Sequence, residues 1–222
     1  MKKLPDARHG IYILGDLDAM TLAETAMTSA GNTELKSIQS ILNAANFAAS
    51  KHAAQKRKGA AAEPYINHLI EVAHLASLAL SEPDPNLIIA ALLHDVIEDC
   101  GVTKDELTKQ FGSDVANLVM DVTDDKSLPK AERKRLQVVN ASKISARAQI
   151  IKLADKISNV RAILTSPPAD WSLERQREYL EWATKVVNNL SVANPVLKAD
   201  FDATSSMFSL PRESSEKVDN RG

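Results

Sequence analysis

The chain has 222 residues, with 27 basic and 29 acidic side chains and a formal net charge of -2 at pH 7. That length accommodates one domain with a sizeable core and extensions, and the near-neutral charge excludes a general attraction to nucleic acid or to an anionic membrane. No stretch reaches the roughly 18 consecutive apolar residues of a membrane span, and residues 1–10 lack the apolar core of a signal peptide. The single cysteine, Cys100, excludes an internal disulfide framework. A cytoplasmic protein that binds neither nucleic acid nor membrane is therefore expected.

The N-terminal residues 1–33 show no sustained hydrophobic period, so they are expected to form an irregular or loosely helical extension. A helical pattern starts at Glu34, where Ile38 and Leu42 begin an apolar stripe, and this helix is predicted to run to about Lys56. The basic residues that close the helix complement the negative end of its dipole, and on composition alone they need no other role.

The next predicted helix, residues 65–80, points a histidine toward the protein core. His68 shares one apolar stripe with Val72 and Leu75, whereas His74 faces the opposite side. A single histidine on an apolar face is more often a hydrogen-bonded core residue than a metal ligand. His68 therefore gains a functional interpretation only in combination with other residues.

Four ionisable residues follow a strongly apolar segment in the middle of the chain. The run Leu87–Leu93 is too apolar for a surface helix and indicates a helix that is buried on most of its circumference. The residues that then enter this environment are His94, Asp95, Glu98 and Asp99. On one continuous helix they can line a single wall, and burying them requires a compensating partner. A divalent cation is the natural partner because imidazole and carboxylate are both good ligands, and Gly101 ends the helix just beyond.

The rest of the chain is also predicted to be helical. Further helices are expected over residues 103–111, 113–121, from Pro129 onward, 146–164, 171–190 and 195–208. No alternating apolar pattern is long enough for a strand, so the expected fold class is all-α. We expect a compact multi-helix domain over residues 34–195, preceded by the 1–33 extension. Residues 196–222 are expected to form a C-terminal helix and a disordered tail.

Three of the predicted core helices each carry a polar intrusion. His68 lies on the first, and His94 lies with Asp95 on the second. Asp155 lies on the third, one turn before Asn159. Two imidazoles and two carboxylates form a ligand set suited to manganese, iron or zinc, with water completing the coordination. The combination predicts a metal centre inside the bundle.

These residues resemble the ligand pattern of a known superfamily. Histidine at position 68, the HD dipeptide at 94–95 and aspartate at 155 resemble the HD superfamily of metal-dependent phosphohydrolases. More narrowly, the chain resembles the small alarmone hydrolases of metazoan SpoT-like type, single-domain relatives of the hydrolase half of RelA/SpoT enzymes. The passages that carry the resemblance are RKGAAAEPYINH (57–68), AALLHDVIED (90–99), VTDDKSLPKAERKRLQ (122–137), KLADKISNVR (152–161) and REYLEWA (177–183).

The resemblance implies an HD-domain bundle that hydrolyses the 3′-pyrophosphate of (p)ppGpp to GDP or GTP and pyrophosphate. It implies Mn²⁺ as the cofactor, held by His68, His94, Asp95 and Asp155. By the same motifs, Glu98 and Asp99 would direct the attacking water. The residues implied to bind the nucleotide are Arg57, whose guanidinium would stack on the base, Lys58, Asn159, Tyr179 and Arg175.

Two other functions stay open at this point. One is an NADPH 2′-phosphatase, an activity attached to animal members of the same group, which would use the same metal site. The other is a non-catalytic alarmone-binding module, against which Glu98 and Asp99 argue because a pure sensor needs neither. Residues after 195 leave no room for a synthetase domain, so a hydrolase alone is expected, with its oligomeric state open. Cys100 stands where these enzymes more often carry threonine.

Overall fold

The computed structural model describes residues 15–191 and 194–209, and no β-strand occurs among them. The all-α fold class is therefore confirmed. The chain divides into two units, residues 1–39 and residues 40–222. The disorder predicted for the C-terminal tail falls on residues 211–222, which lie outside the described residues. No helix in the described part of the chain is long and apolar enough to cross a membrane.

The first helix is longer at one end and shorter at the other than the sequence suggested. α1 covers Gly15–Lys51, so the predicted start at Glu34 is wrong. Residues 15–33 lack an apolar period, but they contain four alanines, two leucines, two methionines and one glutamate, residue types whose intrinsic helix propensity is high. Beyond residue 40, α1 buries Ala44 and Ala48 in the core.

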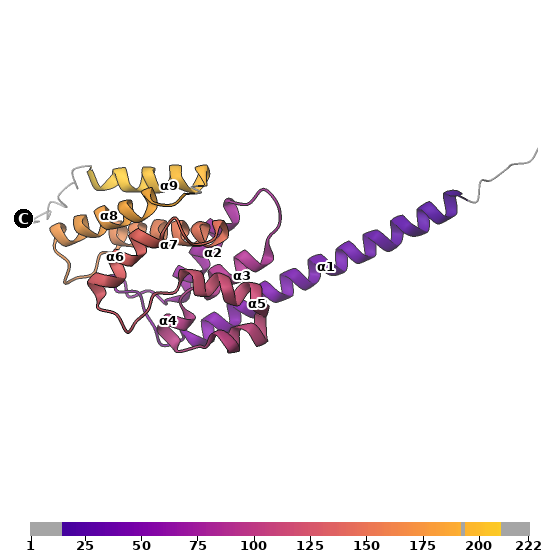
Figure 1. The fold of residues 1–222 in the computed structure, drawn as a ribbon, viewed down its shortest axis with the longest axis horizontal. Helices are drawn as coiled ribbons and strands as arrows, with labels where there is room; N and C mark the ends of the chain where they lie inside the picture. Colours follow the sequence, from indigo (N-terminus) through magenta and orange to yellow (C-terminus); the bar gives the residue numbers. More distant parts are fainter. Residues whose placement is uncertain (1–14, 192–193, 210–222) are drawn as a thin grey trace, which may run out of the picture. The chain divides into compact units, whose positions relative to one another are not determined.

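A single helix organises the bundle of residues 40–222. α7 (Ala146–Thr165) packs against α2, α3, α5, α8 and α9, and Figure 1 shows α8 and α9 beside it. The other helices are α2 (Ile66–Leu78), α3 (Pro85–Leu93), α4 (Val96–Cys100), α5 (Lys104–Val122), α6 (Lys130–Asn140), α8 (Leu173–Asn188) and α9 (Pro195–Ser206). A short 3₁₀ helix, η1 (Met207–Ser209), follows α9. The two short helices predicted after Gly101 form one element, α5, with a break at Gly112, whose φ is 87°.

The prediction of one continuous helix through the central acidic segment is wrong. α3 ends at Leu93 and α4 begins at Val96, so His94 and Asp95 lie at a break between two helices. Neighbouring residues on a continuous helix point about 100° apart. The break instead brings His94 Nε2 within 3.2 Å of Asp95 Oδ2. The predicted stop at Gly101 is confirmed, because this residue adopts the left-handed conformation with φ of 68°.

The segment between α1 and α2 forms a tight loop instead of continuing the first helix to Lys56. Its two sides are joined by hydrogen bonds from Arg57 N to the Glu63 carbonyl (2.9 Å) and from Tyr65 N to the Gln55 carbonyl (3.0 Å). At its tip, a Cβ added to Gly59 would lie 2.2 Å from the backbone oxygen of Ser166. Glycine at 59 therefore lets this loop lie directly against the end of α7.

We expect Gly59→Ala to lower the free energy of unfolding by about 1–3 kcal/mol, because the backbone at Ser166 must shift to admit a methyl group. Thermal and urea unfolding measure the change. Gly31→Ala is the control: an added Cβ there has no described atom within 4 Å, and alanine favours helices over glycine by about 0.5–1 kcal/mol. Equal stability of the Gly59→Ala variant and the unmodified protein would contradict the close packing of the loop.

Candidate metal centre and adjoining cleft

Three helices bring two histidines and an aspartate to one point. His68 comes from α2, His94 from the end of α3 and Asp155 from α7. Each offers a ligand atom, and these atoms all lie within 4.8 Å of one another. Asp155 Oδ1 lies 3.4 Å from His68 Nε2 and 3.8 Å from His94 Nε2. The predicted convergence of these residues is therefore present in the fold.

Asp95, the other carboxylate of the predicted set, approaches the same point from the break after α3. Its Oδ2 lies 3.2 Å from His94 Nε2 and 3.7 Å from His68 Nε2. The same oxygen accepts a hydrogen bond from the Tyr65 hydroxyl at 2.6 Å. Tyr65 in turn stacks on the ring of His52, with centroids 5.0 Å apart. Tyr65 thus holds the Asp95 carboxylate beside both imidazoles.

The unsatisfied groups of this cluster fit a divalent cation. His94 Nε2 is buried and makes no hydrogen bond to any described residue, while its Nδ1 contacts the Ala91 carbonyl oxygen at 2.8 Å. If Nδ1 carries the proton, Nε2 presents a lone pair toward Asp95 and Asp155. A buried polar atom without a partner is costly, and two imidazole nitrogens beside carboxylate oxygens are suitable ligands for a transition metal.

The charges of the cluster depend on one another. Burial disfavours the charged imidazole of His94, but the nearby carboxylates of Asp95 and Asp155 outweigh burial and raise the pKa of His94 to about 9. Burial likewise opposes ionisation of Asp155, yet the Lys156 ammonium at 2.8 Å and the two imidazoles hold the pKa of Asp155 well below its usual value. The metal-free cluster therefore favours ionised carboxylates that attract positive charge.

Two further acids lie on the first turn of α4. Glu98 Oε1 accepts a hydrogen bond from the Asp124 backbone N–H at 2.6 Å, and burial raises the pKa of Glu98 despite that bond. Asp99 accepts hydrogen bonds from Gln55 (2.8 Å) and Lys126 (3.0 Å). These contacts fix the side chains of both acids where α4 lines the cleft described next.

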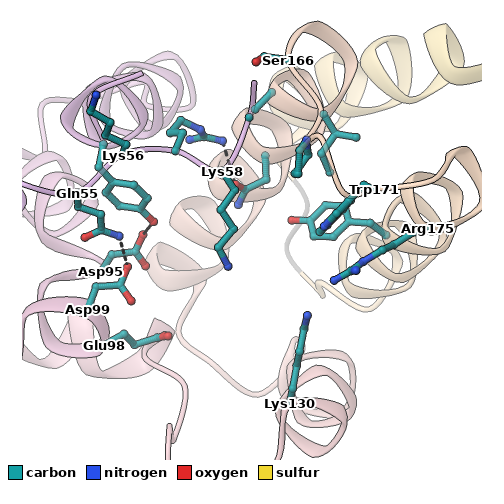
Figure 2. A pocket seen from close by; sticks show the side chains of 18 of the residues that line it. Gln55, Lys56, Lys58, Asp95, Glu98, Asp99, Lys130, Ser166, Trp171 and Arg175 are labelled. Atoms are coloured by element: carbon teal, nitrogen blue, oxygen red, sulfur yellow. Dashed lines mark hydrogen bonds between the residues drawn. The ribbon is translucent and has the colours of Figure 1, made fainter. Parts of the chain in front are cut away.

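A cleft of about 560 Å³ opens beside the cluster and has two chemically different walls. Figure 2 shows Asp95, Glu98 and Asp99 on one wall and Trp171 and Arg175 on the opposite wall. The five residues predicted to bind a nucleotide all line it, and they are Arg57, Lys58, Asn159, Tyr179 and Arg175. Its additional cationic lining residues are Lys56, Lys126, Lys130 and Lys134.

Two of the residues predicted to bind a nucleotide are connected to the candidate metal cluster by hydrogen bonds. Arg57 Nη2 donates to Asn159 Oδ1 at 3.1 Å, and Asn159 Nδ2 donates to Asp155 Oδ1 at 2.6 Å. Arg57 Nη1 is buried and makes no hydrogen bond to any described residue. The Arg57 guanidinium is therefore fixed beside the cleft by Asn159 and keeps one buried N–H donor without a partner among the described residues.

Two of the cationic side chains that line the cleft lie against aromatic rings. The Arg175 guanidinium lies 4.8 Å from the centroid of the Trp171 ring, and the Lys134 ammonium lies 4.6 Å from that of Trp182. In the basic run 133–135, Arg135 forms an exposed ion pair with Glu132 at 2.6 Å, which fits a solvated surface. Lys134, by contrast, lines the cleft.

Sequence reasoning missed three residues that complete the site: Gln55, Tyr65 and Trp171. Tyr65 precedes His68 in the PYINH passage, and an aromatic residue one turn before a ligand is a signal that could have found it. Gln55 donates a hydrogen bond to Asp99 across 44 positions of the chain, and no local pattern predicts such a contact.

The single cysteine contacts a buried histidine. The Sγ of Cys100 lies 3.5 Å from both ring nitrogens of the buried His52.

Comparisons with known proteins agree with this geometry. The family model described as HD domain matches residues 44–185. The chain is 47% identical over 156 residues to a Drosophila melanogaster protein and 48% identical over 158 residues to a Homo sapiens protein. These alignments cover 70% and 71% of this chain and 87% and 88% of the two relatives. Both relatives are named guanosine-3′,5′-bis(diphosphate) 3′-pyrophosphohydrolase MESH1.

A solved structure extends the similarity to three dimensions. The structure of a metazoan ortholog of SpoT, described as hydrolysing ppGpp, matches with a TM-score of 0.72 and 44% identity, and the match covers 76% of this chain and 94% of that one. The helical bundle with histidines and aspartate at its centre is thus an HD domain with a candidate metal site. The chain belongs to the HD domain family and, within it, to the family of the MESH1 proteins.

Divalent metal binding near pH 7.5 should release close to one proton, because His94, with a pKa of about 9 in the metal-free cluster, must lose its proton to become a ligand. Calorimetric titration with Mn²⁺ in buffers of different ionisation enthalpy measures this release. It should be absent in a His94→Ala variant, whose affinity should also be lower. A binding heat that is the same in every buffer would contradict the assigned protonation of His94.

Proposed function

We propose that this protein hydrolyses ppGpp and pppGpp at the 3′-pyrophosphate, yielding GDP or GTP and pyrophosphate. One observation carries the proposal: the His68, His94 and Asp155 cluster adjoins a cleft with cationic and aromatic residues on the wall opposite Glu98 and Asp99. The names of the MESH1 relatives and of the metazoan SpoT ortholog point to the same substrate. All the proposed site residues lie within the 44–185 segment that matches the HD domain.

We further propose Mn²⁺ as the resident metal, with Asp95 as the fourth protein ligand. The mixed imidazole and carboxylate set suits manganese, and Asp95 Oδ2 lies within 4 Å of both histidine Nε2 atoms. When bound, such a cation makes a water molecule more acidic and draws charge from a phosphoryl oxygen. Tyr65 would hold Asp95 in position for this role.

Glu98 is the proposed general base, and Asp99 is its partner in directing water. Burial raises the pKa of Glu98, which makes its carboxylate a stronger base than that of an exposed glutamate. Lys126 lies 3.0 Å from Asp99 and 3.6 Å from Glu98, so the two acids share a nearby positive charge. The proton removed from water would pass to the Glu98 carboxylate.

The proposed nucleotide contacts follow from the cleft. The Arg57 guanidinium, with Nη1 unpaired among the described residues, would stack on or bond the guanine base, and Lys58 lies beside it in the loop. Asn159 and Tyr179 would contact the sugar or the scissile phosphates. Arg175 would bind a phosphate group as a cation on the wall opposite the acids.

Product analysis tests the proposal directly. The Mn²⁺-loaded protein should convert ppGpp to GDP and pyrophosphate in equal amounts. A chelator should abolish the reaction, and added Mn²⁺ should restore it. The same preparation assayed with NADPH should show a lower kcat/KM. Phosphate release from NADPH with the higher kcat/KM would instead identify a 2′-phosphatase, and no turnover of either nucleotide would leave a binding module.

Removing the two acids should separate binding from chemistry. We expect the Glu98→Gln/Asp99→Asn variant to retain ppGpp binding within a few fold and to lose about 10²–10⁴-fold in kcat, because the amides cannot accept a proton from water. Equilibrium binding and single-turnover hydrolysis measure the two effects. Glu132→Gln on the solvated face of α6 is the matched control and should leave both unchanged. Hydrolysis at the unmodified rate by the double variant would remove these acids from the mechanism.

A further inference from the structure

The side of His68 that faces away from the cluster is held by a buried serine. Its Nδ1 lies 2.8 Å from the Oγ of Ser158, which is fully buried on α7. Ser158 Oγ lies 2.6 Å from Glu71 Oε2. Glu71 follows His68 on α2, and Ser158 follows Asp155 on α7. The two helices that supply ligands to the cluster therefore also supply the residues that support His68.

The directions of these hydrogen bonds determine which ring nitrogen of a neutral His68 carries the proton. An ionised Glu71 carboxylate only accepts hydrogen bonds, so the single hydrogen of the Ser158 hydroxyl points to Glu71. The Ser158 oxygen must then accept from His68, which places the ring proton on Nδ1. Nε2 of a neutral His68 consequently carries the lone pair, and this nitrogen faces Asp155 at 3.4 Å.

Arg161 orients the Glu71 carboxylate, which is the last member of this series of hydrogen bonds. Arg161 Nη1 donates to Glu71 Oε1 at 3.1 Å, so one Glu71 oxygen must remain an acceptor for Arg161. Arg161 Nη2 is held by both oxygens of Asp200 on α9, at 2.7 and 2.8 Å. Asp200 lies beyond residue 185, where the match to the HD domain ends.

We propose that Ser158 and Glu71 are positioning residues that lock His68 in the tautomer required for metal binding, and that Arg161 orients Glu71. The proposal rests on the metal site of the proposed function and not on its substrate. A ligand histidine is commonly held through its second nitrogen by a carboxylate or a carbonyl group. In this protein a serine lies between the histidine and the carboxylate, so the direction of a single O–H bond decides which nitrogen of His68 is free.

The decisive variant is Glu71→Gln, which keeps the shape of the side chain. Arg161 requires an oxygen, so the amide nitrogen faces Ser158 and donates to it. The Ser158 hydroxyl then either turns toward His68, forcing the ring proton onto Nε2, or has no acceptor for its hydrogen. Either outcome opposes metal binding, and we expect Mn²⁺ affinity to fall about 10- to 100-fold.

Two more variants test the remaining links. Ser158→Ala removes the acceptor for the His68 Nδ1 proton and should weaken Mn²⁺ binding by a similar factor, about 10- to 100-fold. Adding Arg161→Met to Glu71→Gln frees the amide to turn its oxygen toward Ser158, so affinity should recover toward that of the unmodified protein. Asp84→Asn is the matched control, because Asp84 forms a comparable pair with Arg147 at 2.7 Å away from the cluster. It should lower Tm without changing Mn²⁺ affinity.

The experiment measures Mn²⁺ affinity by calorimetry on the full chain, below the Tm of each variant and without nucleotide. Long-range ¹H–¹⁵N correlation spectra of the unmodified metal-free protein, recorded at a pH where His68 is neutral, add a readout that needs no variant, and they should show the ring proton of His68 on Nδ1. A proton on Nε2, or Glu71→Gln and Ser158→Ala affinities within about threefold of the unmodified protein, would overturn the proposal. Metal binding without ppGpp turnover would refute the proposed function and leave this inference intact.

Discussion

The structure depends on one electrostatic constraint, the burial of two imidazoles and two carboxylates at a single point between three helices. Asp155 and Asp95 lie within 4 Å of both histidine Nε2 atoms, and His94 Nε2 makes no hydrogen bond to any described residue. Such a cluster is costly without positive charge. In the metal-free protein the carboxylates raise the pKa of His94 to about 9, so the protonated imidazole supplies part of that positive charge. A divalent cation would replace the proton and satisfy the same carboxylates.

Different helices supply the residues that surround the cluster and line the cleft. α7 provides Asp155 as a candidate metal ligand, Asn159 as a link to Arg57 and Ser158 as a hydrogen-bond partner of His68. The acids of α4 line one wall of the cleft, while the aromatic and cationic side chains near the start of α8 line the opposite wall. A highly charged nucleotide would thus meet cations along its length and the acids at the bond to be broken.

Much of the candidate site could be predicted because its candidate metal ligands interrupt apolar helical patterns. His68 and Asp155 each stand on a buried stripe, and such intrusions are visible in one sequence. The break at His94 and Asp95 could not be predicted, because a continuous helical pattern conceals it and tertiary packing decides it. The Tyr65 contact to Asp95 spans 30 positions and the Ser158 contact to His68 spans 90, so no local period predicts them. The start of α1 at Gly15 was not predicted because residues 15–33 favour a helix by their composition and show no apolar period.

A metal-soaked crystal tests the central claim most directly. Anomalous diffraction recorded at the manganese edge should show one strong peak in the bundle, coordinated by Nε2 of His68, Nε2 of His94 and a carboxylate oxygen of Asp155, with Asp95 completing the protein ligands. A peak bound elsewhere, or no peak at a Mn²⁺ concentration that supports phosphohydrolysis, would contradict the account.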